Sequence, residues 1–325
     1  MKRFIATILS AIIISAIIPT KAAMEVALDG EFLSINASVN GNHTISYEFC
    51  RCMANHIYTF SRVLIDSTVV NEATSDNIGP FLIDGRGWTG GNHLLPDGKT
   101  PSAFTDRIHI VANRTDTLQG SFNGTAERID IYVSNVLLDP ACQSDTFCTE
   151  QIHYLICGNS IQVEASHSYL NKTPFKIARY YGMQSMMCGE TEILTPCGAY
   201  QQWTPITHVD RFARQSAPHF HQFIEKSPVC YAAAFMTDDG IGDRHLIAPD
   251  DVVFIGNSWS KSYHKLIGGA TIASGDSTHW RGIYTWFVNP IENDGDEFSY
   301  LGYYNGQRAI FSSRLHEKDK ITIIE

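Results

Sequence analysis

The stretch SIQVEASHSY, residues 160–169, alternates between polar and apolar side chains along its whole length. Successive side chains of a β-strand point to opposite faces, so this period of two predicts a strand with one apolar and one polar face. Residues 151–157 form another β-type run, and Gly158-Asn159 separates the two runs. A two-residue turn containing glycine between such runs is typical of a β-hairpin. The residues expected on one face are Ile161, Val163, Ala165, His167 and Tyr169, and those on the other are Ser160, Gln162, Glu164, Ser166 and Ser168.

Similar short runs recur along the chain, separated by Gly, Asn, Asp and Pro. Sustained helical periodicity is nearly absent, and even the best helical stretch, residues 47–62, carries several β-favouring residues. We therefore expect an all-β fold: a large antiparallel β-sandwich, jelly-roll or supersandwich-like, with few helices. Residues 23–325 would form either one large sandwich domain or two β lobes. The other runs are 108–111, 128–133, 230–236, 252–255, 282–288, 300–304 and 309–312.

The N-terminal segment has the order of a secretory signal peptide. Met1-Lys2-Arg3 is positively charged, residues 4–18 are almost entirely apolar, and Thr20-Lys21-Ala22 places small residues at the positions that a signal peptidase reads. The apolar run is shorter than the roughly 20 residues that a membrane-spanning helix needs. We predict a signal peptide over residues 1–22 and a mature protein that is secreted, periplasmic or at the cell surface. Cleavage after Ala23 is the alternative.

The charge of the mature chain narrows the range of partners. Cleavage removes Lys2, Arg3 and Lys21, so 24 basic residues become 21 against 34 acidic ones, a formal charge of −13. A protein this acidic is poorly suited to nucleic acid or to an anionic membrane surface. No later segment has 18 consecutive apolar residues, so we expect no membrane insertion after cleavage.

The eight cysteines, in a chain predicted to be exported, suggest disulfide bonds. Two pairs bracket short polar segments and are expected to form local bridges: Cys142 with Cys148, and Cys188 with Cys197. For the remaining cysteines, buried free thiols and further bridges are both open. They are Cys50, Cys52, Cys157 and Cys230.

The glycine-rich stretch DGRGWTGGNH, residues 84–93, is the first candidate binding site. Glycines let a backbone adopt positive φ angles and come close to a ligand. Here Trp88 could stack on the ligand, Asn92 could bind it, and His93 could bind it or transfer a proton. The alternative is a glycine-rich hairpin in which Trp88 only packs.

Two further segments carry candidate catalytic residues. Arg179 could bind a carboxylate, and Tyr180 or Tyr181 beside it could serve as an acid. His219 and His221 would share one face of a strand, which suits a metal ion or a proton-transfer pair. Ordinary strand packing is the alternative for both segments.

The segment HWRGIYTWF, residues 279–287, is aromatic on one face if it is extended. Trp280, Tyr284 and Trp286 would share that face, and Arg281 would lie on the opposite face. Pointing outward, the three rings would form a platform for sugar rings, with Arg281 as a further substrate-binding residue. Pointing inward, they would belong to the core.

Two acidic clusters, residues 238–243 and 293–297, hold closely spaced oxygen ligands of the kind that Ca²⁺ prefers. Neither matches the full EF-hand spacing, and solvated turns explain them more simply. Calcium is therefore an open possibility, and the sequence requires no cofactor.

Together these features favour an exported carbohydrate-active protein, by analogy with other large exported β-sandwiches. The preferred activity is that of a polysaccharide lyase, which cleaves a uronic-acid-containing glycan by β-elimination. A group must neutralise the carboxylate, a base must remove the C5 proton, and an acid must protonate the leaving oxygen. The alternative is a non-catalytic carbohydrate-binding, adhesion or surface-assembly protein. The candidates are Asn92, Arg179 or Arg281 for neutralisation, His93, His219 or His221 as the base, and Tyr180 or Tyr181 as the acid.

The signal-peptide prediction is tested by expressing the full chain in a host with a secretory pathway. Mass spectrometry of the exported protein should give a mature N-terminus at Ala23. Replacing Ala22 by a bulky residue, as in Ala22→Trp, should cause the precursor to accumulate, because the peptidase site accepts only small residues. An exported protein that still begins at Met1 would contradict the prediction.

Overall fold

The computed structural model describes residues 23–39, 42–72, 77–186, 191–196, 199–207, 209–212, 219–226, 229–236, 252–255, 261–288, 292–317 and 319–324. For residues 185–186, 210–212, 219–226, 229–236, 252–255 and 292–293, the backbone alone is described. The described residues form strands and turns, which confirms the predicted all-β class. They contain no helix that could span a membrane.

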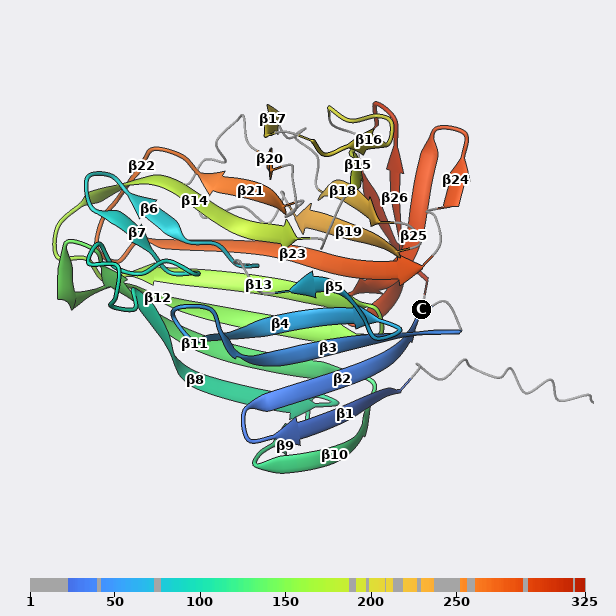
Figure 1. Ribbon diagram of the computed structural model, residues 1–325, viewed down its shortest axis with the longest axis horizontal. Coiled ribbons are helices and arrows are strands. Elements are labelled where there is room, and N and C mark those ends of the chain that lie inside the picture. The colour runs from blue at the N-terminus through green and yellow to red at the C-terminus, as the bar shows by residue number, and fades with distance from the viewer. Residues whose placement is uncertain are drawn as a thin grey trace, which may run out of the picture.

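The largest sheet has ten antiparallel strands, and a six-stranded sheet lies in front of its long central strands (Figure 1). In spatial order the ten strands are β16 (Thr204–Pro205), β15 (Glu192–Leu194), β18 (His219–Lys226), β19 (Val229–Met236), β23 (Ser277–Val288), β13 (Ser160–Tyr169), β12 (Cys142–Cys157), β11 (Ile129–Asp139), β8 (Ala103–Ala112) and β9 (Asp116–Leu118). The six are β10 (Ser121–Ala126), β1 (Met24–Asp29), β2 (Phe32–Val39), β3 (His43–Cys52), β4 (Ile57–Ile65) and β5 (Thr68–Glu72).

The described residues also form two smaller sheets. The seven-stranded sheet contains β17 (Asp210–Phe212), β20 (Val252–Ile255), β21 (Lys261–Ile267), β14 (Phe175–Met186), β6 (Phe81–Ile83) and β7 (Gly87–Thr89), with β22 (Ala270–Ile272) also paired to β14. The four-stranded sheet contains β24 (Glu292–Asp294), β25 (Glu297–Tyr304), β26 (Gln307–Arg314) and β27 (Lys320–Ile323).

The hairpin predicted around Gly158 is present. Cys157 pairs with Ser160 at the turn, and Gly158 adopts a φ of 49°. The alternation of residues 160–169 also holds, because Ile161, Val163 and Tyr169 are fully buried on the inner face of β13. The segment 47–62, the best helical stretch of the sequence, is instead the hairpin of β3 and β4.

The inner face of the ten-stranded sheet packs against both the six-stranded and the seven-stranded sheet. Tyr154 of β12 contacts the rings of Phe49 and Phe60 from β3 and β4. Farther along the same face, Trp280 of β23 donates a hydrogen bond of 2.8 Å to the hydroxyl of Tyr180 on β14. Burying large aromatic side chains removes much apolar surface from water and stabilises the sandwich.

A buried polar network crosses this second interface. His167 Nε2 lies 3.0 Å from Glu150 Oε2 and 3.2 Å from the Tyr180 hydroxyl, and His167 Nδ1 lies 2.9 Å from Thr278 Oγ1. Asn135 Nδ2 donates to the other oxygen of Glu150 at 2.9 Å. Buried polar groups are costly unless they are hydrogen-bonded, so this network fixes how the two sheets meet.

The four-stranded sheet covers one end of the opposite, polar face of the ten-stranded sheet. The backbone nitrogen of Tyr303 donates to Ser160 Oγ at 3.0 Å, and that of Asn305 donates to Gln162 Oε1 at 2.9 Å. Ser160 and Gln162 are therefore buried although they lie on the polar face. Farther along β13, Glu164 and Ser166 stay partly exposed.

The predicted Cys142–Cys148 bridge is wrong: both residues are free thiols. Both lie on β12, whose pairing with β11 shifts register twice between them, and Cys142 is exposed whereas Cys148 is buried. Cys188 and Cys197 lie outside the described residues.

The close packing of the seven-stranded sheet leads to a stability prediction. A Cβ atom on Gly79 would lie 1.4 Å from the backbone oxygen of Tyr181, so Gly79→Ala must shift the backbone of β14. We expect Gly79→Ala to lower the free energy of unfolding by about 3 kcal/mol. Urea denaturation followed by fluorescence measures this change.

Gly124→Ala is the matched control. The three atoms nearest to its added Cβ all belong to the ring of Phe122, which is partly exposed and can rotate. We expect a change below about 1 kcal/mol. Equal losses in the two variants would contradict the packing at Gly79.

Candidate functional site

The polar face of the ten-stranded sheet carries one titratable or aromatic side chain from each of five adjacent strands. Strand register places His109 opposite Tyr132, Tyr132 opposite His153, His153 opposite Glu164, and Glu164 opposite Arg281. We call these five residues the polar row. Adjacent strands lie about 4.8 Å apart, so the row extends for roughly 19 Å across the sheet.

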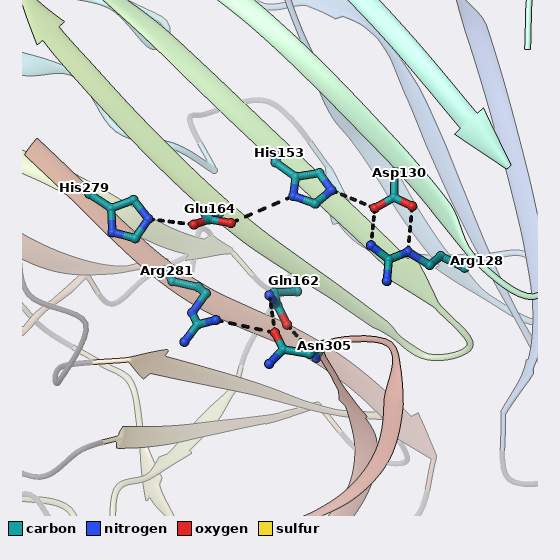
Figure 2. A network of polar contacts seen from close by, with 8 residues as sticks. All are labelled: Arg128, Asp130, His153, Gln162, Glu164, His279, Arg281 and Asn305. Atoms are coloured by element: carbon teal, nitrogen blue, oxygen red, sulfur yellow. Dashed lines mark hydrogen bonds and ion pairs between the residues drawn. The ribbon is translucent and has the colours of Figure 1, made fainter. Parts of the chain in front are cut away.

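At the centre of the row, His153 joins two carboxylates (Figure 2). His153 Nε2 lies 2.8 Å from Asp130 Oδ1, and Arg128 donates two hydrogen bonds of 2.6 Å to the same carboxylate. Burial alone would raise the pKa of Asp130, but the hydrogen bonds from His153 and Arg128 outweigh it and lower the pKa. Asp130 is therefore an ionised acceptor at neutral pH, and His153 Nε2 carries the proton.

The second carboxylate, Glu164, lies between two histidines. Its Oε1 is 2.8 Å from His279 Nε2, and its Oε2 is 3.9 Å from His153 Nδ1. The longer separation exceeds a hydrogen bond, so that contact is electrostatic. His153 and His279 together hold the pKa of Glu164 far below its usual range.

The ionised Glu164 fixes the tautomer of His279. A carboxylate can only accept hydrogen bonds, so Nε2 of His279 must donate. In the neutral ring, Nδ1 then carries the lone pair and can accept a proton. A carboxylate that orients a histidine in this way is the arrangement found in many general-base sites.

The loop between β25 and β26 borders the row beside Arg281. Arg281 Nη2 donates to the Tyr304 hydroxyl at 3.2 Å, and its guanidinium carbon lies 5.6 Å from the centre of the Tyr304 ring. Asn305 Oδ1 accepts from Gln162 at 3.1 Å and from Arg281 Nη1 at 3.4 Å (Figure 2). Arg281 was predicted to bind substrate, and it lies among these groups.

Tyr132 adds an aromatic surface to the row. Its ring stacks on His153, with a centroid distance of 4.4 Å and an interplanar angle of 8°. The Tyr132 side chain is 45% exposed. The row thus offers acidic, basic and aromatic groups within one strip of partly exposed surface.

Three other predicted residues, Trp88, His93 and Tyr181, lie together at the glycine-rich loop, away from the polar row. Trp88 stacks on His93 at 4.8 Å and lies near the ring of Tyr181 at 6.1 Å, and Tyr181 contacts Tyr263 at 4.9 Å. We call Trp88, His93, Tyr181 and Tyr263 the ring cluster; all four are half-buried. Asn92 adjoins it in the chain and accepts a hydrogen bond of 2.8 Å from the Ala54 nitrogen.

Four predicted site residues lie in the core instead. The outward platform of Trp280, Tyr284 and Trp286 is wrong, because all three are at most 1% exposed and face the neighbouring sheets. Tyr180 is also fully buried, and burial raises its pKa well above the usual range. These four side chains cannot contact a ligand in solution.

The other predicted site residues lie on β14 and β18. Arg179 is exposed on β14, where it pairs with Leu82. His219 and His221 lie on a strand, β18, as expected, and their side chains are outside the described part of the structure. The acidic loop 238–243 also lies outside the described residues. Among the described residues, no group of three His, Cys, Asp or Glu side chains could hold a metal ion.

The residues at the centre of the row were not among the predicted site residues. Asp130, His153 and Glu164 each occupy a polar position of an alternating strand, which was the available signal. Their convergence depends on the pairing of β11, β12, β13 and β23. That pairing cannot be deduced from any one strand.

The charge network predicts how stability depends on pH. Burial lowers the pKa of His153, but the hydrogen bond to Asp130 and the nearby Glu164 outweigh it, so the net pKa is raised. The protonated His153 ring therefore stabilises the folded protein. This contribution is complete below about pH 6.5, the ordinary histidine pKa, and is lost as the pH rises through the folded-state pKa of His153. We expect His153→Gln to cost about 1–3 kcal/mol at pH 6 and clearly less at pH 8.

Urea denaturation at both pH values measures this difference. The matched control is His109→Gln, because the His109 ring contacts Tyr132 and no carboxylate among the described residues. The control should change stability equally at the two pH values. A loss for His153→Gln that is the same at pH 6 and pH 8 would contradict the assigned network.

Comparisons with known proteins give matches among solved structures alone. No protein-family model matches the chain, and no curated protein matches it. Among solved structures, it resembles the galactosidase domain of an α-galactosidase–sucrose kinase (9% identity, TM-score 0.49, covering 81% of this chain and 42% of that one). It also resembles an α-galactosidase from Geobacillus stearothermophilus (11% identity, TM-score 0.44, covering 82% of this chain and 41% of that one). A third similar structure is a heparan sulfate lyase mutant from Pedobacter heparinus (6% identity, TM-score 0.41, covering 91% of this chain and 41% of that one). The chain spans about two fifths of the length of these proteins, and likenesses this weak carry no argument about its activity.

Proposed function

We propose that this protein is an exported carbohydrate-active enzyme that cleaves a uronic-acid-containing polysaccharide by β-elimination at the polar row. The observation that carries the proposal is the position of His279 and Arg281 on one face of β23. His279 is oriented by Glu164, and Arg281 adjoins the Tyr304 hydroxyl. A base, a carboxylate-binding group and an acid therefore adjoin one another.

Arg281 supplies the group that binds the uronate carboxylate. A guanidinium can hold a carboxylate through two parallel hydrogen bonds. This pairing stabilises the negative charge that develops on the carboxylate when the C5 proton leaves. In a protein with a formal mature charge of −13, such a local cation is required to hold an anionic substrate.

His279 and Tyr304 move the protons. Nδ1 of His279 takes the C5 proton, the C4–O bond breaks, and a C4=C5 double bond forms. The Tyr304 hydroxyl donates its proton to the departing oxygen, and the neighbouring Arg281 stabilises the resulting phenolate. The products are a sugar with a free anomeric (C1) hydroxyl, which is a new reducing end, and an unsaturated uronate at the other fragment's non-reducing end, with no other reactant consumed. Solvent then returns both residues to their starting states.

The test incubates the mature protein with polygalacturonate, alginate and hyaluronan and follows the ultraviolet absorbance of unsaturated uronate. We expect one polymer to be cleaved by the wild type. His279→Gln should lower kcat by about 10²–10⁴-fold, the usual contribution of a general base. Arg281→Ala should raise KM, and Tyr304→Phe should lower kcat while the fold is unchanged.

His43→Gln is the matched control, because His43 also contacts a carboxylate, that of Asp66 at 2.5 Å, but on the six-stranded sheet. It should keep the wild-type rate. Absence of unsaturated product from all three polymers would refute the proposal. Binding of a polymer without cleavage would instead favour the non-catalytic alternative.

A further inference from the structure

The ring cluster is a group of aromatic side chains that the proposed reaction does not use. It joins Trp88 of β7 and His93 of the following loop to Tyr181 of β14 and Tyr263 of β21. Trp88 is nearly parallel to both His93 and Tyr181, with interplanar angles of 14° and 19°. Contiguous apolar patches at a protein surface often mark binding sites.

The loop that holds the cluster is anchored by buried polar side chains. Asn55, which is 2% exposed, donates to the backbone oxygens of Gly91 at 2.7 Å and His93 at 2.9 Å. Ser102 Oγ accepts from the Gly90 nitrogen at 3.0 Å and donates to the His93 oxygen. A loop tied at both its glycines and its histidine keeps the rings in a fixed arrangement, as a binding site requires.

Gly90 permits this conformation. Its φ of 81° lies in the left-handed region, and an added Cβ would come within 3.0 Å of the Leu137 side chain. Thr89 Oγ1 fixes the preceding residue by donating to the Leu138 oxygen at 2.8 Å. The sharp turn therefore carries Trp88 and His93 to the same place, where their rings stack.

The polar groups beside the rings identify the kind of ligand. Asn92 uses its oxygen to accept from Ala54, and its amide nitrogen has no acceptor among the described residues. Burial and the charge of Lys261 lower the pKa of His93, so its ring is neutral at pH 7 and offers one donor and one acceptor. Lys261 itself is 1% exposed, with Nζ 4.7 Å from the centre of the Tyr263 ring.

Aromatic rings with neutral donors and acceptors suit a ligand with C–H faces and hydroxyl groups. We infer that the ring cluster, with Asn92, is a second carbohydrate-binding site that takes a neutral hexopyranose ring of a glycan chain. A pyranose presents an apolar C–H face to an aromatic ring and hydroxyls at its edge. This binding needs no carboxylate on the sugar, and it does not depend on the proposed elimination.

The test titrates the mature protein with cellohexaose, mannohexaose and galactohexaose, using calorimetry and tryptophan fluorescence. At least one of these neutral β-1,4-linked sugars should bind the wild type and change its fluorescence. Trp88→Ala should weaken that binding roughly tenfold or more, because it removes the aromatic surface on which the sugar ring packs. Asn92→Ala should weaken it by a smaller factor.

Three controls separate the alternatives. Phe32→Ala removes an aromatic side chain that is 45% exposed on β2, and it should bind the sugar as the wild type does. His279→Gln should also bind normally, which separates this site from the polar row. Trp88→Phe keeps a ring in the cluster and should bind with intermediate affinity, even if Trp88→Ala proves unstable.

Two results would overturn the inference. The first is that none of the three sugars binds to the wild type. The second is that binding persists unchanged in both Trp88→Ala and Trp88→Phe. Loss of elimination in His279→Gln with normal sugar binding would leave this site standing, whatever the fate of the proposed reaction.

Discussion

The register of β12, β13 and β23 is the constraint on which the rest of the structure depends. Side chains alternate between faces, so a slip of one residue would exchange the core face and the polar face of a whole strand. In the observed register, His167 points into the core, while Glu164 lies in the polar row. One pairing thus sets both the interior packing and the positions of the titratable groups.

The buried network at Glu150 reinforces this register. Removing one member of a buried, hydrogen-bonded polar group leaves its partners unsatisfied, which costs more than the bond itself contributes. His167 and Glu150 lie on neighbouring strands of the large sheet, and Tyr180 reaches them from the seven-stranded sheet. A displaced sheet would leave these groups without partners, so the network favours one arrangement of the layers.

Much of the fold could be predicted from local patterns, because alternation and glycine turns are encoded over a few residues. The hairpin at Gly158 and the faces of residues 160–169 are examples. The sequence also nominated Trp88, His93 and Tyr181, which do meet, since a glycine-rich loop and nearby aromatics are visible signals. It could not assign Trp280 to the core or find His153. Long-range strand pairing decides which face of a strand is buried and which side chains from different strands meet. The expected Cys142–Cys148 bridge failed because β12 buries Cys148 and leaves Cys142 exposed, which the spacing of the two residues does not reveal.

The loop between β25 and β26 has a geometric consequence for whatever occupies the polar face. Asn305 contacts Gln162 and Arg281, and the same four-stranded sheet covers Ser160. A ligand on the polar face therefore cannot extend along β13 toward Ser160. The exposed groups of the row, by contrast, follow one another from strand to strand. A long, thin molecule bound to the row would therefore lie across the strands, and the β25–β26 hairpin would border it on one side (Figure 2).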